Sequence, residues 1–357
     1  MKESLLKEKY YDIHGLLRIY VKGDAQLLSG VDLHIGAFEV ASNEIVSSVR
    51  ILPYENLPKK AGGKSSDDWQ FVDGYAIRES QRVAFGFEGP ILYFYGDRLH
   101  IPLNLLLQLA LLKVDCTFVH AAGLVSKEKG ILLPAAPGTG KTTTVAIMLR
   151  KHNSLLGDDL CILGKGKIWS YPQSLSIYPY HLAVLPKLPW SIRQNLKFKL
   201  VADSLMKKLF SGRSYVARGI RLMYALTTRP CMSLDPRDVF GHNCLAESAN
   251  LSSVILIERN FSFSDLNIEP VISSVADELT SILWHEWHSY FHELLLFDAL
   301  LYGPDWIEGL FSKTKFVLNS LFEGIQVERL TIPAHWTAQE LSQNSGKYVA
   351  MLQNRIG

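Results

Sequence analysis

The segment Ala135-Ala136-Pro137-Gly138-Thr139-Gly140-Lys141-Thr142, directly after the apolar run Gly130–Pro134, decides which fold this chain is expected to adopt. Its glycines allow the backbone to turn its N–H groups inward. A helix expected from Lys141 to about Lys151 adds the unpaired N–H groups and the positive dipole end of its first turn. A strand, a glycine-rich loop and a helix in this order fit the P-loop pattern Ala/Gly-x-x-x-x-Gly-Lys-Ser/Thr and predict a cradle for phosphate groups.

The residue types of this loop predict that it binds a nucleotide. Lys141 is expected to reach the β- and γ-phosphates and the Thr142 hydroxyl to coordinate Mg²⁺. A glycine-rich turn that merely caps a helix would leave the Gly-Lys-Thr register unexplained, although Ala135 replaces the more common first glycine. The residues predicted to bind the nucleotide are Ala136, Pro137, Gly138, Thr139, Gly140, Lys141, Thr142 and Thr143.

Two further polar features flank the loop. Asp158 and Asp159 follow the predicted strand Ser154–Leu156, and Asp158 comes 17 residues after Lys141. Paired carboxylates at a buried strand end are costly unless they hold a metal or take a proton. His120 lies on the predicted strand Thr117–Val125, expected to run beside Gly130–Pro134, and is assigned a catalytic or phosphate-facing role.

The order of His120, Gly-Thr-Gly-Lys-Thr-Thr (138–143) and Gly-Asp-Asp (157–159) resembles the core of the HPr kinase/phosphorylase and phosphoenolpyruvate carboxykinase superfamily. The resemblance is specific over about Cys116–Leu163. It implies an α/β P-loop kinase core that uses ATP and Mg²⁺ to phosphorylate a hydroxyl group of a peptide or protein serine, or of a small molecule.

The same resemblance implies roles for single residues. Asp158 would be the base and Asp159 the Mg²⁺ partner, although the two roles could be exchanged. Arg229 would stabilise the transferring phosphoryl group, with Arg218 and Arg221 as rivals. The Glu-x-Arg-Gly-x-Gly-type signature for phosphorolysis is absent from the sequence, so neither phosphorylase activity nor HPr as the substrate is expected.

The chain is expected to have three parts. Residues 1–110 are expected to form a strand-rich module and residues 111–320 the catalytic domain. Residues 321–357 are expected to form a C-terminal extension, as part of a helical C-terminal tail. The predicted strands of the module include Leu16–Val21, Val49–Leu52, Phe71–Ile77 and Val83–Phe87, and Ile91–Tyr95 is expected to pair with Arg98–Ile101 as a hairpin. Later strands are expected at Val254–Ile257 and Gln326–Ile332.

Composition restricts the partners. The net charge is +2, 48% of the 357 residues are hydrophobic, and the four cysteines lack zinc or disulfide spacing. With no apparent signal peptide and no apolar run long enough for a bilayer, a cytoplasmic protein without membrane or clear nucleic-acid partners is expected. A homo-oligomer is implied by the resemblance. Lys187–Arg221 carries nine Lys/Arg against one acid, which predicts either a solvated helix face or contact with an anion.

Two other functions compete with phosphoryl transfer. A P-loop ATPase should carry an apolar strand ending in Asp-Glu, but Val254–Ile257 is followed by Glu258-Arg259. A nucleotide-binding regulator without turnover would have no use for Lys141, Thr142, Asp158 and Asp159 together. Both alternatives are weaker than the kinase.

Overall fold

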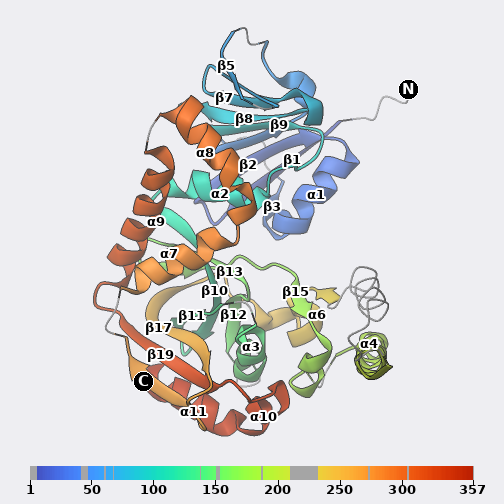
Figure 1. Cartoon of the computed structure of the whole chain (residues 1–357), viewed down its shortest axis with the longest axis vertical. Coiled ribbons are helices and arrows are strands. Elements are labelled where there is room, and N and C mark those ends of the chain that lie inside the picture. The colour runs from blue at the N-terminus through green and yellow to red at the C-terminus, as the bar shows by residue number, and fades with distance from the viewer. Residues whose placement is uncertain are drawn as a thin grey trace. The chain divides into compact units, whose positions relative to one another are not determined.

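The computed structural model describes residues 6–41, 47–59, 62–66, 68–136, 138–149, 153–185, 188–209, 232–271, 274–303 and 305–356. Contacts divide the chain into two compact units (Figure 1). Unit 1 comprises Met1–Val119, Ile162–Gly166 and Ser274–Glu323, and unit 2 comprises His120–Cys161, Lys167–Ser273 and Gly324–Gly357. The units therefore interleave along the chain, whereas the sequence prediction used consecutive segments. The functions assigned to those segments stay predictions.

Unit 1 is built on a nine-stranded sheet in the order β3-β1-β2-β4-β9-β8-β7-β6-β5. The β2–β4 and β4–β9 pairs are parallel and the remaining pairs are antiparallel. The strands are β1 (Lys7–Ile13), β2 (Leu17–Gly23), β3 (Glu39–Val40), β4 (Val49–Leu52), β5 (Lys64–Ser66), β6 (Trp69–Val72), β7 (Tyr75–Arg78), β8 (Val83–Glu88) and β9 (Ile91–Gly96). This architecture agrees with the strand-rich N-terminal module that the sequence predicts.

Two details of that prediction are wrong. The run 71–77 belongs to two strands, because Asp73 and Gly74 both have positive φ angles and form the turn between β6 and β7. The predicted hairpin of 91–95 with 98–101 does not form. Strand β9 instead pairs with β8, with Glu88 opposite Ile91 across a two-residue turn, because such a short connection places the two strands side by side.

Unit 1 also contains helices, of which α1 and α2 contact the strands of this sheet. They are α1 (Ala25–Ile35), α2 (Leu103–Leu112), α7 (Val275–His285), α8 (Phe291–Phe297), the π-helical turn η7 (Asp298–Tyr302) and α9 (Trp306–Phe322). Helix α1, which the sequence analysis missed, starts because the Asp24 carboxylate accepts hydrogen bonds from the N–H groups of Gln26 and Leu27, both at 2.9 Å. Helix α2 agrees with the helix that the sequence predicts from near Pro102 to about Lys113, since proline suits a first helical turn. Its buried Gln108 is satisfied by Thr117 and the Phe118 N–H.

Most residues of a second, eight-stranded sheet belong to unit 2; its order is β11-β10-β13-β14-β17-β19-β18, with β12 paired to β10. Strand β11 is antiparallel to β10 and parallel to β17. The strands are β10 (Cys116–Ser126), β11 (Lys129–Pro134), β12 (Ser154–Gly157), β13 (Leu160–Gly164), β14 (Lys167–Trp169), β17 (Ser248–Asn260), β18 (Asn267–Pro270) and β19 (Gln326–Pro333); β15 (Leu175–Ile177) and β16 (Met232–Leu234) pair separately. The predicted pairing of the His120 strand with the strand before the glycine-rich loop is confirmed.

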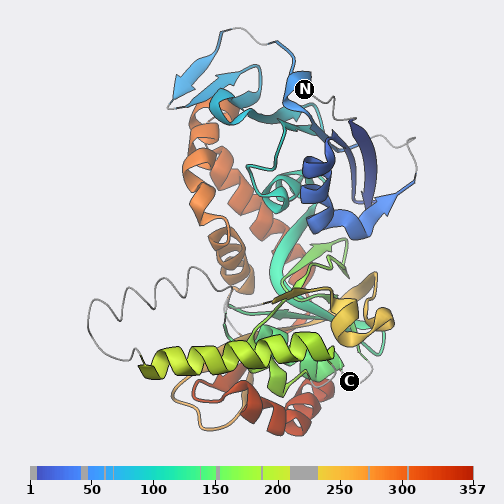
Figure 2. The same cartoon turned by 90° about the vertical axis from the view of Figure 1, so that its right-hand side faces the viewer.

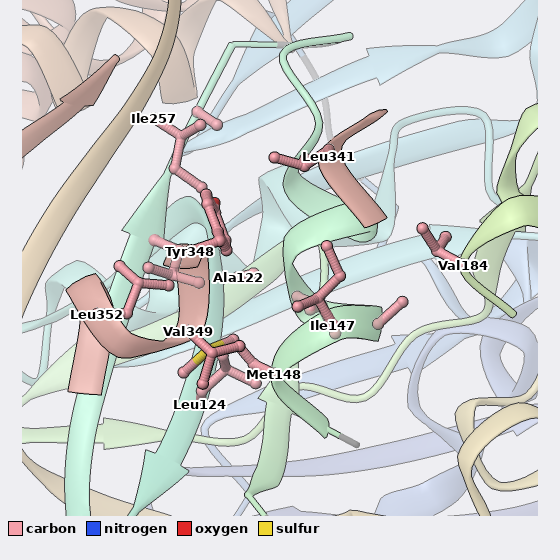
Figure 3. Packing of buried hydrophobic residues seen from close by; sticks show 14 of the residues in the cluster. Ala122, Leu124, Ile147, Met148, Val184, Ile257, Leu341, Tyr348, Val349 and Leu352 are labelled. Carbon is pink, nitrogen blue, oxygen red and sulfur yellow. The ribbon is translucent and has the colours of Figure 1, made fainter. Parts of the chain in front are cut away.

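The hydrophobic core of unit 2 joins segments distant in sequence. Buried residues of α3 (Lys141–Leu149) pack with those of α11 (Ser345–Ile356), and Figure 3 places Val349 beside Met148. The other helices are α4 (Trp190–Leu209), α6 (Pro236–Phe240) and α10 (Ala338–Gln343). Residues 321–357 are thus more than a helical tail, because β19 pairs in parallel with β17 inside the sheet.

Helix α4 covers the first part of the basic segment, and Figure 2 shows it in yellow-green as a long straight helix. Its Leu196 is buried in the core of unit 2, whereas Trp190 and Phe198 are exposed. Lys187 and residues 210–221 of the basic segment lie outside the described residues. Among the helices that the structure describes, none combines the length and apolarity that a membrane crossing needs.

Candidate functional site

The glycine loop (residues 135–142) connects β11 to α3. Strand β11 ends at Pro134, and α3 begins at Lys141. Gly138 and Gly140 have φ angles of 80° and 110°, which side chains other than glycine rarely tolerate. The Thr139 hydroxyl donates to the Ala136 carbonyl at 2.8 Å and closes the turn. The loop therefore adopts a tight, glycine-dependent conformation directly before a helix N-terminus.

Lys141 is the centre of a polar cluster beside this loop. Its side chain is only 9% exposed, and its Nζ lies 2.8 Å from His120 Nε2 and 2.9 Å from Asp159 Oδ1. Because an ammonium group can only donate, Nε2 of His120 accepts, which assigns the proton of a neutral imidazole to Nδ1. The 21 residues that separate His120 and Lys141 are thus bridged by the pairing of β10 and β11.

Asp158 is buried next to the first turn of α3. Its Oδ2 accepts a hydrogen bond from the Thr142 hydroxyl at 2.8 Å. Burial raises the pKa of Asp158 to about 6, against the opposing effects of Lys141 and the Thr142 hydrogen bond. Its Oδ1 is buried with no hydrogen-bond partner among the described residues. Asp158 therefore has one carboxylate oxygen without a hydrogen bond, and its pKa of about 6 lies close to neutral pH.

Asp159 has the opposite electrostatics. Partial desolvation by its neighbours acts to raise the pKa, but the charge of Lys141 and the Lys141 hydrogen bond outweigh this and hold the pKa of Asp159 below its ordinary value. The side chain is 59% exposed, and Oδ1 lies 3.6 Å from His120 Nε2. Asp159 therefore remains a solvent-accessible anion at neutral pH.

Two residues that the sequence pattern does not single out hold the loop and the helix after it. Arg259, at the end of β17, donates from Nε to the Thr139 carbonyl at 2.9 Å and from Nη1 to the Trp336 carbonyl at 2.6 Å. The Tyr348 hydroxyl of α11 is hydrogen-bonded to the Thr144 hydroxyl at 2.7 Å. An arginine at the carboxyl end of a buried strand was the available signal for Arg259, whereas Tyr348 has no local signal in the sequence.

The remaining predicted site residues fall into three groups. Ala136, Gly138, Thr139 and Gly140 lie in the loop. The Thr143 side chain is buried, so a contact of this residue with a phosphate would use its backbone N–H. Pro137 and Arg229, with its rivals Arg218 and Arg221, lie outside the described residues.

The donor set fits a magnesium ion that arrives with phosphates. The Thr142 hydroxyl and the carboxylates of Asp158 and Asp159 are oxygen donors of the kind Mg²⁺ prefers, and Mg²⁺ commonly completes its shell with phosphate and water. Within the described residues, no three His, Cys, Asp or Glu side chains are grouped as a metal site. Protein groups here would supply two or three ligands, and phosphate and water the others.

Comparison with known proteins gives little. No family model and no curated protein sequence matches this chain. Among solved structures, the HPr(Ser) kinase/phosphatase from Coxiella burnetii matches with a TM-score of 0.27 and 9% identity, over 67% of this chain and 93% of that chain. At this score the likeness has no bearing on function, and the structure establishes a mixed α/β protein with several sheets and helices.

Proposed function

We propose that this chain is a phosphotransferase that passes the γ-phosphoryl group of Mg·ATP to a substrate hydroxyl. One observation carries the proposal: Lys141, His120 and two carboxylates of opposite titration behaviour converge on the first turn of α3, beside a glycine loop. Phosphoryl transfer requires charge neutralisation and alignment more than covalent chemistry. A buried cation, a helix N-terminus and two acids supply those elements.

The groups divide into phosphate-binding and proton-accepting roles. Lys141 and the loop N–H groups would hold the phosphates, and His120 would keep the Lys141 ammonium in place through its 2.8 Å contact. Thr142 and Asp159 would hold Mg²⁺, which neutralises charge on the phosphates when bound. Asp159 suits this role because it stays ionised.

Asp158 would act as the base. The pKa of a base should lie near the working pH, and that of Asp158 is raised to about 6. As the substrate oxygen bonds to the γ-phosphorus, the bond from that phosphorus to the bridging oxygen would break and ADP would leave. The substrate O–H bond would break at the same time, and its proton would go to the unpartnered Oδ1 of Asp158. Asp159 is the more accessible carboxylate. An experiment must therefore exclude the opposite assignment, in which Asp159 is the base and Asp158 holds Mg²⁺.

The competing ATPase function would need a free catalytic carboxylate at the end of β17, where Glu258 lies. The Glu258 carboxylate there accepts hydrogen bonds from Arg329 Nη1 at 2.9 Å and the Thr331 hydroxyl at 3.1 Å. Both of its oxygens are thereby engaged by β19, and no aspartate precedes it. A group held in this way is poorly placed to orient a hydrolytic water.

Nucleotide binding is tested first, with Lys141→Met. Mg·ATP should stabilise the wild type by about 2.7 kcal/mol at a hundredfold excess over Kd, because bound ligand favours the folded state by mass action. Lys141→Met should lose this stabilisation and still fold, as measured by thermal unfolding with and without Mg·ATP. Lys129→Met, at the other end of β11, is the matched control. Equal stabilisation of both variants would place the phosphates elsewhere.

The base is tested by comparing Asp158→Asn with Asp159→Asn. Asp158→Asn should lower single-turnover transfer to serine-containing peptides by roughly 10²–10⁴-fold with Mg·ATP affinity nearly unchanged, because only the proton acceptor is lost. Asp159→Asn should weaken Mg·ATP binding as well. Loss of metal-nucleotide affinity in Asp158→Asn, with retention in Asp159→Asn, would exchange the two roles. Nucleotide binding without transfer to any hydroxyl would reject the kinase proposal.

A further inference from the structure

Unit 1 contains a cavity of about 380 Å³ that the proposed kinase chemistry does not use. Its wall is mainly apolar and comes from β8, α2 and α9, through Phe87, Leu109, Leu112, Trp306 and Leu310. This volume lies within the range of small-molecule sites, which are typically apolar with a few polar groups. The cavity is therefore large enough for a small organic ligand.

Two lysines give the lining its charge. Lys113 follows α2, and its ammonium lies 5.2 Å from the centre of the Phe87 ring. Lys313 belongs to α9, pairs with Asp115 and lies 5.6 Å from the Phe316 ring centre. An ammonium group has three donors, so the Asp115 contact leaves Lys313 able to bind a second anion. Among the described residues, Lys113 forms no ion pair.

Among the described residues of the lining, Gly309 is the one without a side chain, and it leaves space open at the cavity wall. It lies inside α9, where a glycine is a poor helix former. A Cβ built on Gly309 meets no atom within 4 Å, so no neighbouring side chain explains the absence of a larger residue. Because Gly309 itself lines the cavity, a side chain at this position would narrow the cavity without a clash at its base.

The segment beside the cavity has two unusual features. The turn η7 before α9 is π-helical, a rare form often found at functional sites. Its Tyr302 stacks on Trp306 with ring centres 4.6 Å apart and lies 6.2 Å from Phe87. The Tyr302 hydroxyl is buried without a hydrogen-bond partner among the described residues.

We propose that this cavity binds a small amphipathic carboxylate, with its apolar body against Phe87, Leu109 and Trp306 and its anionic end at Lys113 and Lys313. The apolar wall favours a ligand with an apolar body, and the two ammonium groups favour one with a negative charge. The proposal concerns unit 1 alone and does not depend on phosphoryl transfer.

Calorimetric titration with octanoate, phenylbutyrate and indolepropionate tests the charge requirement. At least one acid should bind, and its neutral amide should bind roughly ten-fold more weakly, because the amide cannot pair with the lysines. Lys113→Met should weaken the acid by about five-fold, the upper range for an exposed ion pair. Lys129→Met, on β11, should leave its affinity unchanged. Equal affinity for acid and amide, or no binding of any acid, would overturn the proposal.

Gly309→Leu tests the location. Its side chain should occupy the cavity and abolish binding, while thermal unfolding should show a protein at least as stable as the wild type, since leucine is the better helix former. Gly346→Leu, at an exposed and open position of α11, is the matched control and should bind the acid normally. Undiminished binding to Gly309→Leu would overturn the proposal. So would self-association of the wild type that Gly309→Leu removes, because a second copy would then be the occupant.

Discussion

At the scale of the residue, the contrast between Asp158 and Asp159 organises the candidate site. The two carboxylates are adjacent in sequence, yet one is buried against Thr142 and the other faces solvent beside Lys141. Burial disfavours the charged form of Asp158, and the neighbouring ammonium group of Lys141 favours the charged form of Asp159. Two chemically identical side chains thereby become suited to accepting a proton and to remaining an anion.

This contrast predicts opposite effects on stability. The folded pKa of Asp158, about 6, exceeds its ordinary value of 3.8, so the folded state binds the extra proton between these values. Stability from this group therefore falls as pH rises from about 4 to about 6, and near pH 8 the cost is on the order of 3 kcal/mol. Asp158→Asn should raise the free energy of unfolding near pH 8, with a gain that shrinks towards pH 4.

Asp159→Asn should show the reverse. The pKa of Asp159 is lowered by folding, so its contribution is present above the ordinary value and is lost as pH falls through the folded value. The variant should be less stable than the wild type at neutral pH, with a deficit that disappears in acid. Chemical unfolding of both variants at several pH values measures this, and parallel profiles for the two would contradict the assigned environments.

At the scale of the element, the end of β17 fixes the glycine loop from the side. Arg259 connects the Thr139 carbonyl to the Ala334 and Trp336 carbonyls after β19, so one guanidinium group holds two loops. Ala135 also pairs directly with Ile257 of β17. The loop is thus positioned by its neighbouring strand as well as by its own glycines.

Arg259→Met should consequently weaken Mg·ATP binding. Losing hydrogen bonds from a charged donor frees the loop before binding, and a cost of about 1.4 kcal/mol corresponds to roughly a ten-fold higher Kd. The effect should be smaller than that of Lys141→Met, because Arg259 acts on the loop conformation. Calorimetric titration of Mg·ATP measures it. Arg329→Met, on the adjacent β19, is the control, and equal affinities of both variants would contradict a positioning role for Arg259.

Across the whole molecule, the features that depend on residues near one another in the chain were predictable from the sequence, and those that depend on distant residues were not. The loop between β11 and α3, the β10–β11 hairpin and helix α2 were predictable, because glycine conformations, short turns and apolar periodicity act between near neighbours in the chain. The type of residue at Lys141, Thr142, Asp158 and Asp159 likewise indicated phosphate chemistry. Helix α1 escaped prediction although its Asp24 cap is local, because its apolar face is short.

From the sequence alone the strand–loop–helix segment was predictable, and Lys141, Thr142, Asp158 and Asp159 could be proposed as the residues that contact a phosphate or its metal ion. Only the tertiary structure decided which of the two aspartates is buried, and that Arg259 and Tyr348 secure the loop and its helix across 120 and 204 residues of chain. The reason is physical: pairing β17 with β11, and packing α11 on α3, depend on how all strands and apolar faces are satisfied together. Burial, and with it the pKa of Asp158, is a property of that assembly and of no single segment.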